Sequence, residues 1–321
     1  MQPLYASGLV KLFEADCRTW LQGREPNSIH AVVTDPPYGM VEYSRGQLAK
    51  LRSGRGGVWR IPPSMGGSQR APLPRFTVLS ESELTYLFEF FEEWTDLLIR
   101  VLTPGAHVFL ATSPLFNHVV SQALVSAGLE KRGEIVRLVR TLRGGDRPKG
   151  AEKEFPTVSA MPRSSWEPWL VFRKRLEGTL AENLRTWSTG ALRRPAEDTP
   201  FVDVIASGRT PREEKSIAPH PSLKPQGFLR QLVYGALPLG QGVVLDPFAG
   251  SGSTLAACEA IGYAAIGIES DATYARLATK AIPKLAAVPT SVHSALVVHM
   301  WDPGTPGSRG ASPSRNGGSK R

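Results

Sequence analysis

The sequence predicts an α/β fold with a central, mostly parallel sheet. Two short apolar runs each lead into an Asp-Pro turn: residues 29–33 precede Asp35, and residues 243–245 precede Asp246. Continuous apolar runs of this length are typical of parallel strands that are covered on both faces. A helix start follows the second turn, and a further strand is expected at residues 264–268. Strands that alternate with helices in this way predict parallel βαβ units.

The elements before the first Asp-Pro turn are short. Residues 9–14 predict a strand, followed by a helix or turn and then by the strand that leads to Asp35. Pro36 and Pro37 end that strand, because proline has no N–H to donate and its φ is fixed. The chain therefore leaves the sheet at its carboxyl edge, where open α/β sheets place their ligands.

The turn Asp35-Pro36-Pro37-Tyr38 carries groups that suit an amine substrate. The exocyclic amine of a nucleobase is a poor nucleophile, because its lone pair is delocalised into the ring. The Asp35 carboxylate and the Pro36 carbonyl can accept hydrogen bonds from its two N–H groups. The Tyr38 ring can stack on the base, a contact worth roughly 1–3 kcal/mol. An ordinary Pro-Pro turn after a strand is the alternative.

Residues 41–75 are expected to form a mobile basic loop directly after this turn. They hold seven Arg or Lys residues and one acid, among many glycines and prolines. Because functional loops cluster beside sites, this loop is interpreted as a lid over DNA and an extruded base. A disordered insert without a role is the alternative. The candidate phosphate contacts in the loop are Arg52, Arg55 and Arg60.

A long helix, a strand and a second helix are expected next. The helical pattern starts with a capping box at residues 80–83 and is expected to end at Pro104-Gly105. Residues 107–112 predict a central strand, and residues 115–127 predict the second helix.

The periodicity weakens between about residues 131 and 215. Two strand-like segments, residues 134–139 and 169–172, stand among basic loops. Residues 131–175 hold twelve Arg or Lys residues against five acids, whereas residues 76–130 hold one Arg and seven acids. Such localised positive charge indicates a nucleic-acid cleft, with purely structural connections as the alternative. The candidate contacts to phosphates and base edges are Arg143, Arg147, Lys149, Arg193 and Arg194.

A second candidate site follows the strand that ends in Asp246. Gly250 and Gly252 let a ligand approach the backbone closely, and the N-terminus of the next helix favours an anionic group. Glu269 ends the following strand, about 20 residues past the glycines, the usual place for a carboxylate that binds ribose hydroxyls. Leu255 stands where a nicotinamide fingerprint has Gly or Ala, so the pocket is predicted to bind a different nucleoside ligand.

The remaining chain predicts a helix that runs to Leu237 and a final helix at residues 271–287. Residues 292–301 are apolar and have no assigned place, and residues 303–321 are expected to form a disordered basic tail. No apolar run reaches membrane length and the N-terminus lacks a signal-peptide pattern, so a cytoplasmic protein, associated with the nucleoid through DNA, is expected.

Overall composition favours a polyanionic partner. The net charge is +9, from 38 basic and 29 acidic residues. Two cysteines, Cys17 and Cys258, give no disulfide framework. The six histidines lack metal-ligand spacing, so no metal is expected.

Asp35-Pro36-Pro37-Tyr38 together with residues 246–252 resembles the amino-group DNA methyltransferases that use S-adenosylmethionine. The catalytic motif precedes the cofactor glycines, an order similar to the β class of that family. This resemblance spans about residues 9–285 and implies a Rossmann-like methyltransferase fold that is circularly permuted, with basic loop insertions for DNA recognition.

The resemblance also implies roles for further segments. Residues 220–225 are similar to the family's segment that helps to hold the methionine moiety, residues 14–16 to the segment near the adenine, and residues 165–169 to the lining of the target-base pocket. The implied cofactor-binding residues are Asp16, Lys224, Asp246, Phe248, Gly250, Ser251, Gly252, Thr254 and Glu269.

A chain of 321 residues suits one large domain with insertions. The resemblance implies a methyltransferase domain over residues 1–300. Its parts are a catalytic half at residues 1–130, a target-recognition region at about 131–215 and a cofactor half at 216–290.

The implied reaction is site-specific transfer of a methyl group to the N6 amino group of adenine in duplex DNA, after the base is flipped out of the stack. Cytosine-N4 methylation is the nearest alternative, and Asp rather than Ser before Pro-Pro favours adenine. Methylation of RNA or protein, and a DNA-binding subunit without catalysis, are less favoured. Neither cysteine follows a proline, so the nucleophile of cytosine-C5 methyltransferases is missing. Duplex DNA is the implied partner, and a homodimer and a cognate restriction endonuclease remain open.

Overall fold

The structure is a computed structural model. It describes residues 1–37, 81–139, 147–148, 150–160, 162–220 and 222–290, together with the backbone of two short strands. These two strands, β4 (Ser64–Met65) and β5 (Ser68–Gln69), pair antiparallel. The rest of the predicted basic loop 41–75, the apolar residues 292–301 and the predicted tail 303–321 lie outside the described residues.

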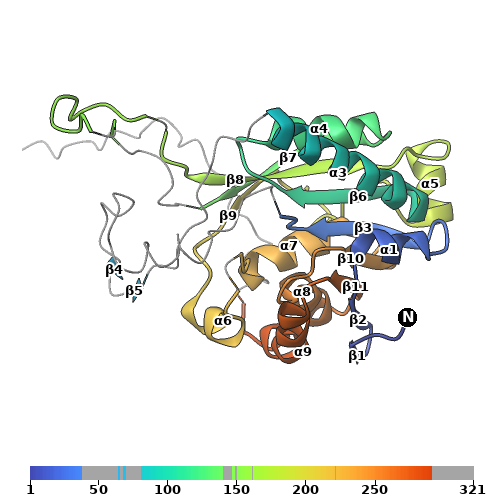
Figure 1. The fold of residues 1–321 in the computed structure, drawn as a ribbon. Coiled ribbons are helices and arrows are strands. Elements are labelled where there is room, and N and C mark those ends of the chain that lie inside the picture. Colours follow the sequence, from blue (N-terminus) through green and yellow to red (C-terminus); the bar gives the residue numbers. More distant parts are fainter. Residues whose placement is uncertain are drawn as a thin grey trace, which may run out of the picture.

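The described strands form a nine-stranded sheet in the order β1-β2-β11-β10-β3-β6-β8-β7-β9 (Figure 1). Every pairing from β2 through β11, β10 and β3 to β6 is parallel. Strand β8 runs antiparallel between β6 and β7, which therefore point the same way. The predicted mostly parallel sheet is confirmed. The bounds are β1 (Tyr5–Ser7), β2 (Val10–Glu14), β3 (Ile29–Thr34), β6 (Leu102–Ala111), β7 (Glu130–Leu138), β8 (Trp166–Arg173), β9 (Val204–Ala206), β10 (Val243–Asp246) and β11 (Ala264–Glu269).

Strands β3 and β10 are neighbours at the centre of the sheet, although they come from opposite ends of the chain. Val244 pairs with Ala31, and Leu245 pairs with Val32. Because the pairing is parallel, both Asp-Pro turns leave the sheet at the same carboxyl edge. The permuted chain order thus brings the two predicted sites side by side.

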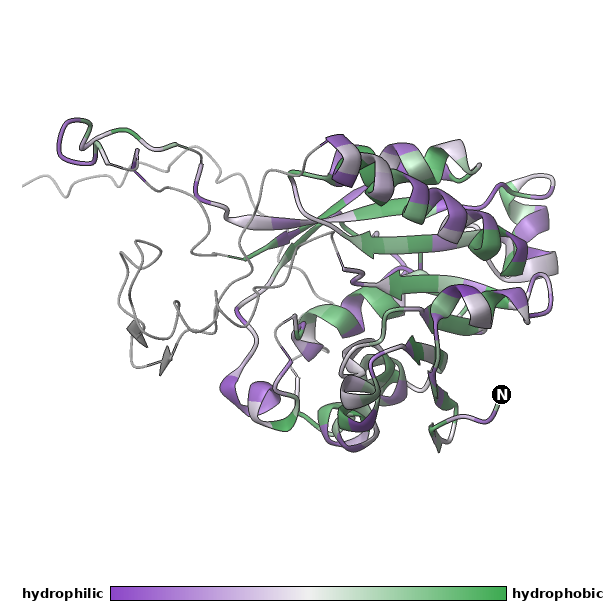
Figure 2. Ribbon diagram, viewed as in Figure 1, coloured by the Kyte–Doolittle hydropathy of each residue, from purple (hydrophilic) through white to green (hydrophobic). Residues whose placement is uncertain are grey.

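Helices cover both faces of the sheet (Figure 1). Alternate residues of β3 enter different cores: Ala31 and Val33 pack in one cluster, and Val32 packs in the other. This period of two explains why the central strands are largely apolar, as the green colouring in Figure 2 shows, whereas β7 also carries exposed polar residues. The helices are α1 (Cys17–Gln22), α3 (Glu81–Val101) and α4 (Asn117–Ser126) on one face, and α7 (Gln226–Ala236), α8 (Ser253–Ile261) and α9 (Ala272–Ala286) on the other.

The boundary between α3 and β6 differs from the prediction. The helix ends at Val101, and the strand begins at once with Leu102, which pairs with Ile29 of β3. Pro104, expected to stop the helix, lies inside the strand, where its carbonyl accepts hydrogen bonds from Asn183. Sheet pairing takes over from the helix before proline is reached.

The weakly periodic region 131–215 contains more structure than the sequence indicates. Besides the β7–β8 hairpin it holds α5 (Leu180–Trp187), α6 (Arg212–Ile217) and β9. Helix α5 starts with a capping box between Thr179 and Glu182, and this sequence pattern is the local signal that predicts the start of the helix. Among the helices that the structure describes, none is long and apolar enough to cross a membrane.

Candidate active site

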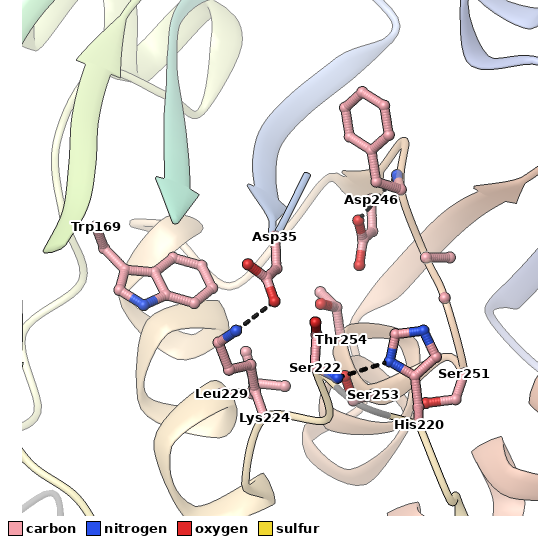
Figure 3. Close-up of a pocket in the computed structure, with 13 residues that line it drawn as sticks. Asp35, Trp169, His220, Ser222, Lys224, Leu229, Asp246, Ser251, Ser253 and Thr254 are labelled. Carbon is pink, nitrogen blue, oxygen red and sulfur yellow. Dashed lines mark hydrogen bonds and ion pairs between the residues drawn. The ribbon is translucent and has the colours of Figure 1, made fainter. Parts of the chain in front are cut away.

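Asp35 directly follows β3, and its carboxylate pairs with the ammonium group of Lys224 (Figure 3). The two side chains are 16% and 10% exposed, so the ion pair is largely shielded from water. Lys224 belongs to the loop that leads into α7. The catalytic turn and the segment expected to hold the methionine moiety therefore meet at one point.

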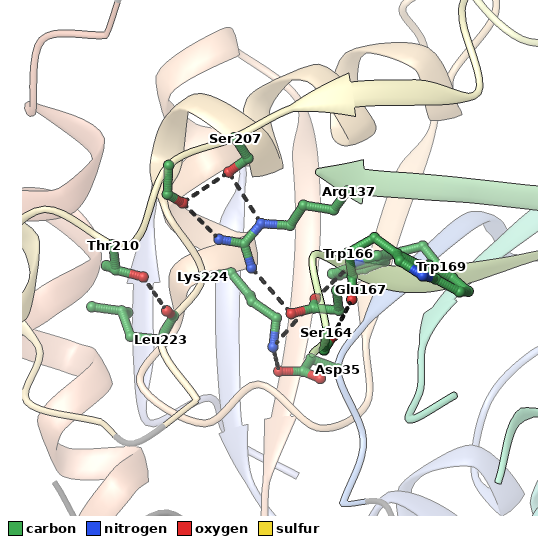
Figure 4. Close-up of polar contacts among 11 residues, drawn as sticks. Asp35, Arg137, Ser164, Trp166, Glu167, Trp169, Ser207, Thr210, Leu223 and Lys224 are labelled. Carbon is green, nitrogen blue, oxygen red and sulfur yellow. Dashed lines mark hydrogen bonds and ion pairs between the residues drawn. The ribbon is translucent and has the colours of Figure 1, made fainter. Parts of the chain in front are cut away.

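Two further charges extend this ion pair. The Lys224 Nζ lies 3.7 Å from Oε1 of Glu167 on β8, and Oε2 of Glu167 lies 3.2 Å from the Arg137 guanidinium on β7 (Figure 4). Neither residue is predicted as a site residue by the sequence, although Glu167 lies in the segment 165–169. Nothing local marks either residue, because their partners come from other strands and loops.

Asp246, which ends β10, is 3% exposed. Its carboxylate accepts hydrogen bonds from the Thr34 hydroxyl at 2.7 Å, from the backbone N–H of Phe248 at 3.2 Å and from the Thr254 hydroxyl. Burial raises the pKa of Asp246 to about 6, although these donors act in the opposite direction. The side chain therefore connects β3, β10 and α8, and it lines the cavity between the two turns.

The glycine-rich turn after β10 leads into α8. Gly250 and Gly252 have φ of +52° and +81°, in the left-handed region that favours glycine. A Cβ added to Gly250 would meet the His220 ring at 3.2 Å, so any larger residue at this position would crowd the wall of the cavity. Glu269 accepts a hydrogen bond of 2.7 Å from the Gly250 N–H and one of 2.8 Å from the Asp271 N–H. This carboxylate holds the turn in place.

One cavity joins the two turns. Figure 3 shows the Asp35, Lys224 and Trp169 side chains grouped on one side, with His220, Ser251 and Thr254 on the other. His220 makes an edge-on contact with Tyr274 at 4.4 Å between ring centroids, and burial lowers its pKa. The imidazole ring is therefore neutral near pH 7 and lines the pocket without adding charge.

Other predicted cofactor residues take structural positions. Asp16 is exposed and caps α1, where its carboxylate accepts 3.0 Å hydrogen bonds from the N–H groups of Arg18 and Thr19. The Phe248 ring packs against Trp94, with centroids 5.8 Å apart. Ser251 is buried in the cavity wall. Among the described ranges, no group of His, Cys, Asp or Glu is arranged to hold a metal ion.

The predicted DNA contacts are divided in the structure. The Arg193 guanidinium donates to the Tyr263 hydroxyl at 2.5 Å and stacks over Tyr234. Tyr263 precedes β11, so Arg193 lies at the edge of the sheet opposite Asp35. Arg194 is its exposed neighbour, and Arg147 is exposed as well. Tyr38, Arg52, Arg55, Arg60, Arg143 and Lys149 lie outside the described residues.

The fold and the site together define a methyltransferase of the Rossmann-like class, with a carboxylate turn beside a glycine-rich turn. The sequence profile of a family described as DNA methylase, specific for N6 and N4 amino groups, matches residues 29–280. This match covers most of the chain, so the chain belongs to that family of S-adenosylmethionine-dependent DNA methyltransferases. The predicted family, fold and cofactor are confirmed.

Individual relatives agree with this assignment. The Type II methyltransferase M.HindIII of Haemophilus influenzae is 26% identical over 81% of this chain and 91% of its own length. A Thermus thermophilus DNA modification methylase, solved with S-adenosyl-L-methionine, superposes with a TM-score of 0.52 at 18% identity over 86% of this chain and 94% of that one. The cytosine-N4-specific PvuII DNA methyltransferase superposes with a TM-score of 0.58 at 11% identity, over 92% of this chain and 95% of that one.

Proposed function

We propose that this enzyme transfers a methyl group from S-adenosylmethionine to the N6 amino group of adenine at specific sites in duplex DNA. The observation that carries the proposal is the single cavity in which Asp35 faces the glycine turn of Gly250. The order of the motifs and the Type II relatives support a DNA substrate. Asp rather than Ser before Pro36 favours adenine over cytosine.

Asp35 and the Pro36 carbonyl accept the two N–H groups of the flipped base. Accepting these bonds draws the nitrogen toward tetrahedral geometry and frees its lone pair for in-line attack on the methyl carbon. With the cofactor bound, the nitrogen would take the methyl group as the S–C bond breaks, and the proton that the nitrogen then loses would pass to water. Tyr38 stacks on the base. The acceleration comes from positioning and electrostatics.

The glycine turn, the start of α8 and Glu269 fit the cofactor. Gly250 has a left-handed φ, and because a Cβ there would crowd the His220 ring, glycine keeps the backbone of this turn clear of a side chain. Glu269, at the end of β11, is placed to accept ribose hydroxyls. When bound, S-adenosylmethionine supplies a sulfonium-activated methyl group. Lys224 pairs with Asp35 and lines the same cavity as the glycine turn, so its ammonium is assigned to both parts of the site.

DNA phosphates are expected to contact Arg52, Arg55, Arg60, Arg143, Arg147 and Lys149. Arg193 is left out of this interface because its partners lie at the opposite edge of the sheet. The enzyme is proposed to act in the cytoplasm, on the nucleoid. A homodimer and a cognate restriction endonuclease stay predictions, which light scattering and examination of the neighbouring genes would check.

The test is to incubate the full chain with S-adenosylmethionine and duplex DNA and to analyse the nucleosides of the digested product. N6-methyladenine is the expected product, and modified-base sequencing would then give the recognition site. If the product is N4-methylcytosine, the substrate is cytosine, the alternative, and not adenine. Absence of both, in a preparation that binds the cofactor, would overturn the proposal.

A further inference from the structure

Four charged side chains of alternating sign lead from the hairpin of β7 and β8 to the catalytic turn. They are Arg137, Glu167, Lys224 and Asp35, and Figure 4 shows them in line. Each ion pair is within 4 Å, and the four charges sum to zero. The first two residues lie in the region 131–215, to which the family resemblance gives target recognition, and the last lies at the proposed methyl-transfer site.

The far end of this chain of charges is held firmly. The Arg137 guanidinium donates at 3.1 Å to the Ser207 hydroxyl and to the Gly208 carbonyl, and it lies 5.1 Å from the centre of the Phe228 ring. The side chain is only 5% exposed. Its carboxylate partner, Glu167, is also fixed by a 2.9 Å hydrogen bond from the Trp169 indole. Glu167 therefore presents a rigid anion to Lys224.

Lys224 needs such an anchor. A lysine ammonium is a point charge on a flexible four-carbon stem, so one carboxylate alone does not define its position. If Asp35 were the sole partner of Lys224, the ammonium would also withdraw electron density from the Asp35 carboxylate. That carboxylate would then be a weaker acceptor for the hydrogen bond from the substrate amine. A second carboxylate 3.7 Å away both fixes the ammonium and shares its charge.

We infer that Glu167 is a positioning residue for methyl transfer, which acts through Lys224 to orient Asp35 and preserve its strength as an acceptor. This inference rests on the proposed role of Asp35. Glu167 itself need not touch the substrate. Because β7 and β8 supply the anchor, the catalytic carboxylate is tied to the strands of the target-recognition region.

The same hairpin contains a matched control. Arg137 faces Glu167 across β7 and β8, and at the other end of the same strands Glu130 faces Arg173. The second pair is 2.7 Å long and lies at the opposite edge of the sheet from Asp35. Both pairs join the two strands in the same way, whereas only the first reaches Lys224.

The experiment compares Glu167→Gln with Glu130→Gln in the full chain. Glu167→Gln should lower kcat about 10- to 100-fold, the scale for a small misplacement of reacting groups, with KM for both substrates within about threefold of wild type. Glu167→Asp should recover part of kcat, because it keeps the carboxylate. Glu130→Gln should leave kcat unchanged at a similar Tm. Equal kcat in the two Gln variants would overturn the inference.

A double-mutant cycle tests the route through Lys224. In a Lys224→Gln background, adding Glu167→Gln should lower kcat less than twofold further, because the ammonium that it positions is gone. Full additivity would overturn the inference. If Glu167→Gln does not fold, kcat of Glu167→Asp in the two backgrounds decides in the same way. If Asp35→Ala is active, the proposed function is wrong. If Asp35→Ala is inactive and Glu167→Gln has the kcat of wild type, only the inference about Glu167 is wrong.

Discussion

Two neighbouring strands of the sheet end in the same dipeptide, yet their aspartates lie in opposite environments. Asp35 follows β3, is partly exposed to the cavity and pairs with a cation, Lys224. Asp246 ends β10, is 3% exposed and accepts hydrogen bonds from the hydroxyls of Thr34 and Thr254. The first aspartate forms an ion pair at the cavity wall, and the second, which also lines the cavity, connects β3, β10 and α8 through its hydrogen bonds.

The difference shows that a strand ending in Asp-Pro defines a place in the fold but not a chemical role. The proline ends pairing in both cases, and both carboxylates reach the carboxyl edge of the sheet. Their partners decide the rest. Asp35 has an ammonium neighbour, Lys224, whereas burial raises the pKa of Asp246 to about 6.

Substitution of the first aspartate should have the largest effect. Asp35→Ala should lower kcat by about 10²- to 10³-fold, the scale for loss of one preorganised polar group, while the Kd for S-adenosylmethionine barely changes. Single-turnover methylation and calorimetric titration would measure the two quantities. A near-normal kcat would show that Asp35, like Asp246, has a structural role and does not act in methyl transfer.

Substitution of the second aspartate should appear in the pH dependence of stability. Folding raises the pKa of Asp246 from 3.8 to about 6, so its protonated form is favoured in the folded state. That contribution is complete below pH 4 and is lost as the pH rises through 6. The free energy of unfolding of wild type should therefore fall by about 3 kcal/mol relative to Asp246→Asn between pH 4 and 7. Urea unfolding across this range is the measurement, and a constant difference would contradict the buried environment.

Glu269 extends the comparison to the carboxylate that holds the cofactor turn. Glu269→Ala should weaken S-adenosylmethionine by about 10- to 100-fold, because it removes both the proposed ribose acceptor and the bond to the Gly250 N–H. Glu259→Ala is the matched control, since Glu259 lies on α8, not on β11, and its carboxylate accepts a hydrogen bond from the Tyr5 hydroxyl. Calorimetry should find weaker binding in the first variant alone, and wild-type affinity in folded Glu269→Ala would exclude the residue from the site.

The smallest effect concerns the bond that links the two turns. Thr34→Val keeps the side-chain shape but removes the 2.7 Å hydrogen bond to Asp246. Unfolding free energy should drop by about 1–2 kcal/mol, and the pKa of Asp246 should rise further, since one stabilising donor is lost. Urea unfolding and carboxyl NMR titration would detect the two changes. An unchanged pKa would show that Thr34 contributes little to the environment of Asp246.

The sequence by itself determined the family, the two turns and the central strands, but not the short outer strands β1 and β9. Apolar runs that stop at Asp35-Pro36 and at Asp246 carry their own boundary signals, because proline and chain polarity act locally. The spacing of apolar residues likewise predicted the helix of residues 81–101. The predicted end at Pro104-Gly105 was wrong, because Leu102 already pairs with β3.

Only the tertiary structure decided which side chains meet. Lys224 reaches Asp35 from 189 positions away in the chain, and Glu167 and Arg137 complete the set from two other strands. Arg193 has the charge of a DNA contact, yet two tyrosines hold it at the far edge of the sheet. Charge and residue type are properties of the sequence, whereas the partner of a charge depends on strand order and register, which arise only when the sheet is assembled.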